Sequence, residues 1–295
     1  MTLMKLWSCC LKLACFRERS ETMKRFYRNI GEITIHIWID DDIWLRAGTE
    51  IGFLLRTYCP DDNENQMNVL GYTYYIHDKG NESKINCERH YDCDINAKDW
   101  MFNLINDLET FYSDVLKCTT IHGSCIRVKG KTILLVGERY SGKTTLTHYF
   151  TVGMEEEYLS DDCVYLVNDH CLGFAMPLPM RELQEEYGEK KYFTQTIDSD
   201  GVLRSLYIPP KYVKQLPQVN YIIFPKYARD GKNEIRIIPK GEAFKQLTHN
   251  VRGHGEFRRV FEDVKAMVLN AECYMANYTS CTMLYDLLLQ RGMIS

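Results

Sequence analysis

The stretch that decides the fold is Thr132–Leu146, TILLVGERYSGKTTL. An apolar run leads directly into the pattern Gly-x-x-x-x-Gly-Lys-Thr, which extends from Gly137 to Thr144. A strand, this pattern and a following helix together are typical of a P-loop, which binds nucleotide phosphate. The sequence therefore predicts a nucleotide-binding loop formed by Gly137, Glu138, Arg139, Tyr140, Ser141, Gly142, Lys143, Thr144 and Thr145.

The residue types of this loop suit phosphate chemistry. Gly137 and Gly142 permit a tight turn and leave backbone N–H groups open to a phosphate. A helix beginning near Lys143 adds the positive end of its dipole. We expect the Lys143 ammonium to reach the β- and γ-phosphate oxygens, and the Thr144 hydroxyl to ligate the Mg²⁺ that accompanies a nucleotide.

Composition bounds the class of protein. With 295 residues and 45% hydrophobic residues, the chain has enough apolar surface for one large or two small globular domains. A net charge of −4 gives no basic field, so we do not expect nucleic acid as a partner. The twelve cysteines are irregularly spaced beside a nucleotide-binding motif, which favours reduced thiols and a cytoplasmic protein.

The first 22 residues differ from the rest. They are apolar but interrupted by Lys5 and Lys12, and are therefore too short and too charged for a transmembrane segment. We interpret residues 1–22 as a non-native or flexible extension. A short interfacial helix acylated at Cys9, Cys10 or Cys15 is the alternative.

Residues 23–117 are expected to form a β-rich region that ends in a helix. The strands expected there are Ile33–Ile39, Ile51–Tyr58 and Leu70–Ile76, punctuated by Asp, Asn and Gly clusters and paired in antiparallel fashion. Apolar residues recur with helical spacing over Trp100–Leu116.

Residues 118–295 are expected to form the P-loop domain, of mixed α/β (α+β) class with a mixed sheet. The strands predicted from the pattern are Ser124–Val128, Thr132–Val136, Tyr158–Val167, Val202–Tyr207, Tyr221–Phe224, Ile235–Pro239 and Ala271–Asn277. The helices predicted are one from the P-loop to about Phe150, then Gly241–Leu247, Glu256–Val268 and Thr282–Arg291.

A pair of acids stands out within the apolar segment Leu159–Leu166. Adjacent strand residues point to opposite faces, so one of Asp161 and Asp162 would ordinarily be a solvated side chain. At a strand end beside a P-loop, however, one acid can hold Mg²⁺ while the other accepts a hydroxyl proton. The Asn-Lys-x-Asp and Leu-Ser-Gly-Gly patterns of two other large P-loop classes do not occur.

The order of His122-Gly123, a hairpin, the P-loop and then Asp161-Asp162 resembles the HPr kinase/phosphorylase family, in the P-loop class that includes phosphoenolpyruvate carboxykinase. The resemblance covers roughly residues 115–290. It implies an HPr kinase-type catalytic core that uses ATP and Mg²⁺, in which Lys143 contacts phosphate. It also implies that Asp161 is the general base with His122 adjacent, and that Asp162 and Thr144 are metal ligands. The sequence alone leaves the roles of Asp161 and Asp162 exchangeable.

Two departures from that family bear on function. Thr145 replaces the acid that follows the family's P-loop Ser/Thr, and no glycine-rich C-terminal signature matches, so phosphorylase activity is not expected. Pro177–Arg181, Tyr221–Tyr227 and Gly241–Leu247 resemble the shorter kinases of bacterial peptide-tailoring clusters, including lasso-peptide precursor kinases. Arg181 is either a contact to the transferring phosphate or an ordinary surface arginine.

The resemblance implies a kinase that transfers the γ-phosphoryl group of ATP to a Ser/Thr hydroxyl of a peptide or protein, including a ribosomal peptide precursor. Phosphorylation of a small metabolite such as free serine is one alternative, and a non-catalytic nucleotide sensor or scaffold is another. No motif decides between ATP and GTP. Exposed edge strands make a homo-oligomer an open expectation.

Overall fold

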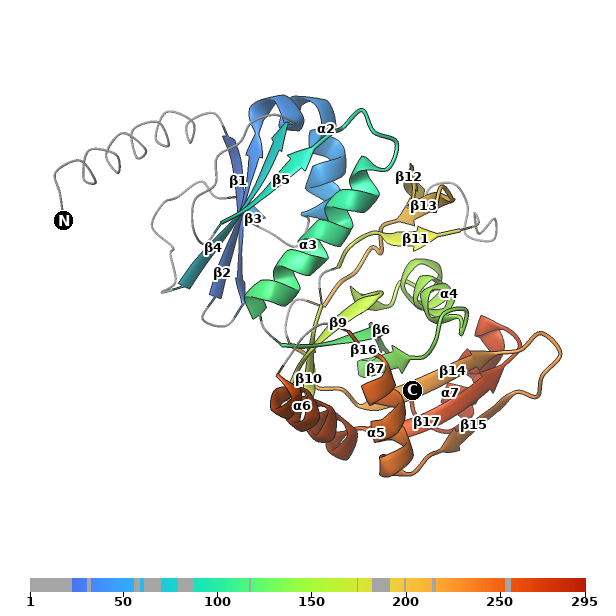
Figure 1. Ribbon diagram of the computed structural model, residues 1–295. Helices are drawn as coiled ribbons and strands as arrows, with labels where there is room; N and C mark the ends of the chain where they lie inside the picture. Colours follow the sequence, from blue (N-terminus) through green and yellow to red (C-terminus); the bar gives the residue numbers. More distant parts are fainter. Residues whose placement is uncertain are drawn as a thin grey trace. The chain divides into compact units, whose positions relative to one another are not determined.

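The computed structural model describes residues 23–30, 33–55, 59–60, 70–78, 88–116, 118–173, 175–181, 192–198, 200–213, 216–252 and 256–295. The extension expected over residues 1–22 lies outside this part of the chain. The chain divides into two compact units, one ending at Asp107 and one running from Leu108 to Ser295. This division falls within helix α3 (Trp100–Leu116), which Figure 1 labels. It lies upstream of the boundary between residues 117 and 118 that the sequence suggests.

The first unit contains a five-stranded sheet in the order β3-β1-β2-β4-β5. Its strands are β1 (Met23–Ile30), β2 (Ile33–Asp40), β3 (Cys59–Pro60), β4 (Leu70–Asp78) and β5 (Glu88–Cys93). Strands β1 and β2 are antiparallel, but β2, β4 and β5 are mutually parallel neighbours. The expected antiparallel arrangement is therefore wrong for this half of the sheet, because β2 and β4 are joined by a connection that contains a helix.

That helix also corrects a predicted strand. Residues Ile51–Leu54 are the last turn of α2 (Asp41–Leu54), whereas the sequence indicated a strand over Ile51–Tyr58. Residues 56–58 lie outside the described part. Buried residues recur every three or four positions in this helix, at Ile43, Ala47, Ile51 and Leu54. They form one apolar face of a helix that begins well before the expected strand Ile51–Tyr58.

The second unit is built on a nine-stranded mixed sheet. Its main path is β10-β9-β6-β7-β14-β17-β15, and β8 and β16 pair with β6 outside that path. Its strands are β6 (Thr119–Val128), β7 (Lys131–Val136), β8 (Glu157–Ser160), β9 (Cys163–Val167), β10 (His170–Leu172), β14 (Tyr221–Tyr227), β15 (Glu234–Ile237), β16 (Val251–Arg252) and β17 (Glu272–Tyr278). A separate three-stranded sheet contains β11 (Leu178–Met180), β12 (Tyr192–Ile197) and β13 (Leu203–Tyr207).

Helices cover both faces of the large sheet. Among the described residues after α3, the helices are α4 (Lys143–His148), which continues as the π-helix η1 (Tyr149–Gly153), then α5 (Lys240–His249), α6 (Phe257–Asn270) and α7 (Cys281–Gln290). Buried residues of α5 and α6 pack on one face, and those of α4 and α7 pack on the other. The predicted mixed α+β class is confirmed.

Strand β7 lies inside this sandwich and delivers the P-loop. Leu134 and Val136 belong to the core beneath α5 and α6, while Ile133 and Leu135 belong to the core beneath α4 and α7. A strand buried on both faces explains the uninterrupted apolar run before Gly137. Within the described residues, the helices are too short or too polar to cross a membrane.

The segment Tyr158–Val167 is not one continuous strand as expected. It consists of β8 and β9, with Asp161 and Asp162 in the turn between them. Asp162 has a φ of 67°, which is incompatible with an extended strand. The turn places both acids directly after the end of β8, and a strand end is the position at which the sequence pattern indicates a chemical role for them.

Candidate active site

The predicted P-loop forms the connection between β7 and α4. Gly142 precedes the first residue of α4 and has a φ of 93°, which glycine adopts without strain. A β-carbon at this position would lie 2.0 Å from the phenolic oxygen of Tyr278. The backbone at Gly142 must therefore remain free of a side chain, as a loop that approaches a phosphate closely requires.

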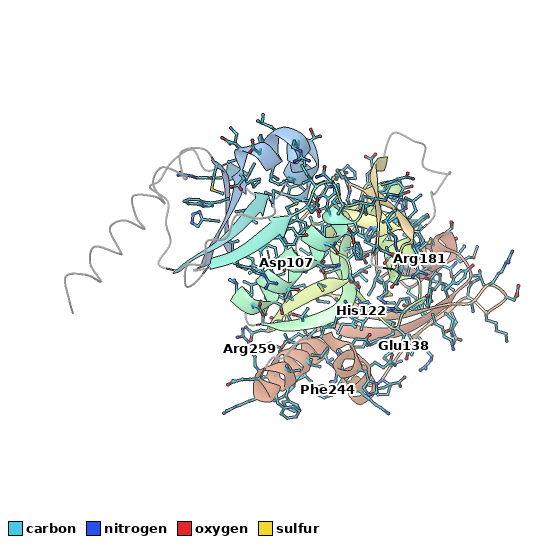
Figure 2. The ribbon with its side chains drawn as sticks, turned by 45° about the horizontal axis from the view of Figure 1, so that its top comes forward. Asp107, His122, Glu138, Arg181, Phe244 and Arg259 are labelled. Atoms are coloured by element: carbon cyan, nitrogen blue, oxygen red, sulfur yellow. The ribbon has the colours of Figure 1, made fainter. Side chains whose placement is uncertain are left out.

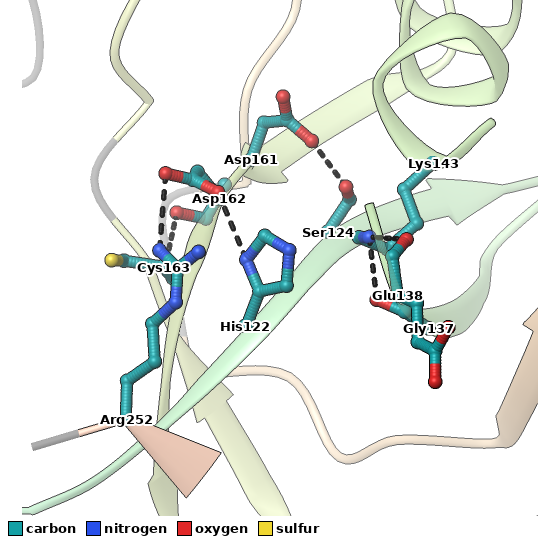
Figure 3. A network of polar contacts seen from close by, with 10 residues as sticks. His122, Ser124, Gly137, Glu138, Lys143, Asp161, Asp162, Cys163 and Arg252 are labelled. Carbon is teal, nitrogen blue, oxygen red and sulfur yellow. Dashed lines mark hydrogen bonds and ion pairs between the residues drawn. The ribbon is translucent and has the colours of Figure 1, made fainter. Parts of the chain in front are cut away.

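Lys143 is directed back onto the loop. Its Nζ donates to the carbonyl oxygens of Gly137, at 2.6 Å, and Glu138, at 2.9 Å (Figure 3). The residue is 7% exposed, and burial lowers the pKa of the ammonium. The two carbonyls hold the positive charge at the mouth of the loop, where a phosphate would meet it.

Ser141 supplies a polar atom suited to a ligand. Among the described residues, its buried Oγ has no hydrogen-bond partner. Leaving a buried hydroxyl unsatisfied costs about 1–3 kcal/mol. This orphaned donor, the side-chain-free backbone of Gly142 and the Lys143 ammonium fit a bound phosphate group.

Asp161 occupies a buried position beside the loop. It is 7% exposed, its Oδ1 accepts a hydrogen bond from Ser124, and its carboxylate interacts with the Thr144 side chain. Burial raises the pKa of Asp161 to about 6, despite the hydrogen bond from Ser124. The hydrogen bonds compensate the negative charge of Asp161 only in part. A nearby cation would therefore stabilise its ionised form.

Asp162 faces a different set of partners. Its Oδ1 lies 2.9 Å from Nδ1 of His122, and its Oδ2 accepts from Nη1 of Arg252 at 3.2 Å (Figure 3). Burial alone would raise its pKa, but the contact with His122 and the charge of Arg252 outweigh it and lower the pKa to about 2. Asp162 is therefore an ionised carboxylate with both oxygens engaged.

Other predicted residues lie outside this acidic turn. Arg181 donates from Nη1 to the Tyr140 hydroxyl at 3.3 Å, and its guanidinium carbon lies 5.1 Å from the centre of that ring. Tyr140 is 78% exposed with a φ of 67°. The side chains of Glu138 (Figure 2), Arg139 and Thr145 are exposed. We therefore expect these residues to contribute backbone atoms, and not side chains, to the loop.

Three residues of the site were not predicted. Ser124 lies two positions after His122 on β6, and strand alternation places both on one face, so this residue had a readable signal. No sequence signal points to Arg252 or Glu109, because β16 and α3 are distant in sequence from the acidic turn. Burial and the nearby charge of Asp162 raise the pKa of Glu109 to about 8.

The residues around Asp161 also fit Mg²⁺. The Thr144 hydroxyl and the Asp161 carboxylate interact, and both are hard oxygen ligands of the type that Mg²⁺ takes beside nucleotide phosphates. Asp162, which is expected on the metal side from the resemblance, contacts His122 and Arg252.

Fold and site together define a mixed α+β protein with a P-loop and an adjacent acidic turn. No protein-family model matches the chain, and no curated protein does. Among solved structures, it is similar to the Hpr(Ser) kinase/phosphatase from Coxiella burnetii, with 12% sequence identity and a TM-score of 0.31, over 59% of this chain and 96% of that one. This TM-score is too low for residues to be matched between the two structures.

Proposed function

We propose that the chain is an ATP- and Mg²⁺-dependent kinase that transfers the γ-phosphoryl group to a Ser/Thr hydroxyl of a peptide or protein. A P-loop alone names no reaction. The observation that carries the proposal is the division of two adjacent acids between different partners. Asp161 lies with Thr144 and Ser124, whereas Asp162 lies with His122 and Arg252.

These different partners favour one assignment of roles to the two acids. It is the reverse of the assignment that the resemblance implies, in which Asp161 is the base and Asp162 a metal ligand. Asp161 would hold Mg²⁺ together with Thr144, and the ion would neutralise charge on the phosphates when bound. Asp162 would be the base, with His122 beside it. In this assignment Asp161 acts beside the loop residue Thr144, and Asp162 acts beside His122 and Arg252.

The chain's own groups account for the remaining steps. The loop amides and the Lys143 ammonium would hold the β- and γ-phosphates and stabilise the charge that develops in transfer. The acceptor oxygen would bond to the γ-phosphorus as the bond to the ADP oxygen breaks. The hydroxyl proton would pass to the Asp162 carboxylate.

The test is an acceptor screen read by mass spectrometry. Purified protein is incubated with ATP, Mg²⁺ and a peptide library in which each peptide carries one serine or one threonine, and a parallel set contains free serine and other small hydroxyl compounds. Asp162→Asn is the control for transfer. An 80-dalton gain on peptide hydroxyls that forms much more slowly in the control supports the proposal.

Other outcomes of the screen redirect the assignment. Phosphorylation confined to the small compounds would replace the peptide acceptor by a metabolite. Nucleotide binding without transfer to any acceptor would contradict a kinase and favour a nucleotide sensor.

A further inference from the structure

We infer that Arg252 is a positioning residue that holds the Asp162 carboxylate in its working orientation. This inference rests on the proposed function, because it deepens the role of Asp162 as the base. Arg252 lies ninety residues after Asp162 in the sequence, so only the fold brings them together.

The pairing of β16 with β6 places Arg252 at the acidic turn. Arg252 is the register partner of Thr120, and the backbone N–H of His122 donates to the carbonyl of Asn250 at 2.7 Å. The same stretch of backbone therefore fixes both the strand that carries His122 and the residue that reaches Asp162. The two-residue strand β16 thus brings the Arg252 side chain to the site.

The contacts fix the carboxylate at both oxygens. His122 contacts Oδ1 and Arg252 contacts Oδ2, while the backbone carbonyl of Asp162 accepts from the N–H of Gly123 at 3.3 Å. The backbone of Asp162 has a φ of 67°, in the left-handed region that few residues other than glycine adopt. Side chains that hold such a residue from two sides maintain a geometry that its local sequence does not favour.

The ionised carboxylate of Asp162 is stabilised by a cation beside it. Ligand-type atoms of Glu109, Asp162 and Cys163 lie within 4.8 Å of one another. Asp161 adds a further carboxylate at the next position in the chain. The Arg252 guanidinium, whose side chain is 39% exposed, supplies the positive charge that pairs with the Asp162 carboxylate in this cluster.

Removal of the guanidinium should thus impair the chemical step and spare nucleotide binding. For Arg252→Ala, we expect kcat to fall about 10- to 100-fold because a misplaced catalytic group costs that much. The KM for ATP and the dissociation constant of ATP should stay within about twofold of wild type, since the P-loop is untouched. Arg252→Lys should recover part of kcat, and exposed Arg258→Gln is the matched control.

A double-mutant cycle with Asp162→Asn separates positioning from direct contact with the phosphate. If Arg252 acts through Asp162, Arg252→Ala will cost little further kcat in the Asp162→Asn background. Additive losses, an equal loss in Arg258→Gln, or a rise in KM with unchanged kcat would each overturn the inference. If thermal unfolding shows that Arg252→Ala is not folded, the same cycle is measured with Arg252→Lys.

The outcome also distinguishes this inference from the proposed function. Wild-type transfer with additive losses overturns the positioning role alone. No transfer by nucleotide-bound wild-type protein overturns both.

Discussion

The phenolic oxygen of Tyr278 lies 2.0 Å from the point that a β-carbon on Gly142 would occupy, and Tyr278 donates to the carbonyl oxygen of Ser141 at 3.1 Å. Strands β7, β14 and β17 are parallel, so the carboxyl ends of β7 and β17 meet at one edge of the sheet. Tyr278 is the last residue of β17 and the P-loop follows β7. The sheet thus supports the loop that we propose to bind phosphate.

Gly142→Ala should displace the loop. The new methyl group would clash with Tyr278 and would sit on a backbone with a φ of 93°. We expect ATP affinity to fall by at least about tenfold and the free energy of unfolding to fall by about 1–3 kcal/mol. Calorimetric titration and thermal unfolding measure the two effects.

Gly130→Ala is the matched control for this substitution. Gly130 has a φ of 75°, but a β-carbon there meets no atom within 4 Å. Its cost should be limited to backbone strain, about 1 kcal/mol, with ATP affinity unchanged. Equal effects of the two substitutions on ATP affinity would contradict the steric account.

Tyr278→Phe should loosen the loop without distorting it. The change removes the hydrogen bond to Ser141 and keeps the ring, which is 2% exposed. We expect a loss of about 0.5–1.5 kcal/mol in the free energy of unfolding and weaker ATP binding. Hydrogen exchange of the loop amides reports the change directly, and unaltered exchange would count against the supporting role of Tyr278.

The two acids should affect stability in opposite directions as pH changes. Burial raises the pKa of Asp161 from 3.8 to about 6, so the folded state binds more protons than the unfolded state between these values. Its contribution therefore becomes less favourable as pH rises from about 4 to 6. Asp161→Asn should gain stability relative to wild type over that interval, by roughly 1–3 kcal/mol.

Asp162→Asn should do the reverse. The folded-state pKa of Asp162 is lowered from 3.8 to about 2, so its favourable contribution is present above about pH 4 and is lost as pH falls toward 2. This variant should be less stable than wild type at pH 7. Denaturant titrations in EDTA without nucleotide measure both variants, and parallel pH profiles would contradict the different environments.

The sequence predicted the elements whose signals are local. The loop Gly137–Thr144, its two flanking elements and most helices of the second unit follow from spacing over a few residues. The predicted helix Glu256–Val268, for example, is α6, Phe257–Asn270.

What escaped prediction depends on long-range pairing or on competing patterns. Arg252 reaches Asp162 through a pairing between β16 and β6, to which no local pattern points. The segment Ile51–Tyr58 predicts a strand because it is rich in β-forming residues, whereas burial of Ile43 and Ala47 with Ile51 favours the helix. The roles of Asp161 and Asp162 depend on a turn in which Asp162 has a left-handed backbone. Because this residue is not glycine, the sequence does not indicate the turn.

The measurement that tests the central claim most directly is calorimetric titration of ATP, with and without Mg²⁺, into wild-type protein and Lys143→Ala. Lys143 is held at the loop mouth by the carbonyls of Gly137 and Glu138, so its ammonium should meet the phosphates. The account predicts Mg²⁺-dependent binding by wild type and a loss of about 100-fold or more in the variant. Equal ATP affinity of the two proteins, or no binding by wild type, would contradict it.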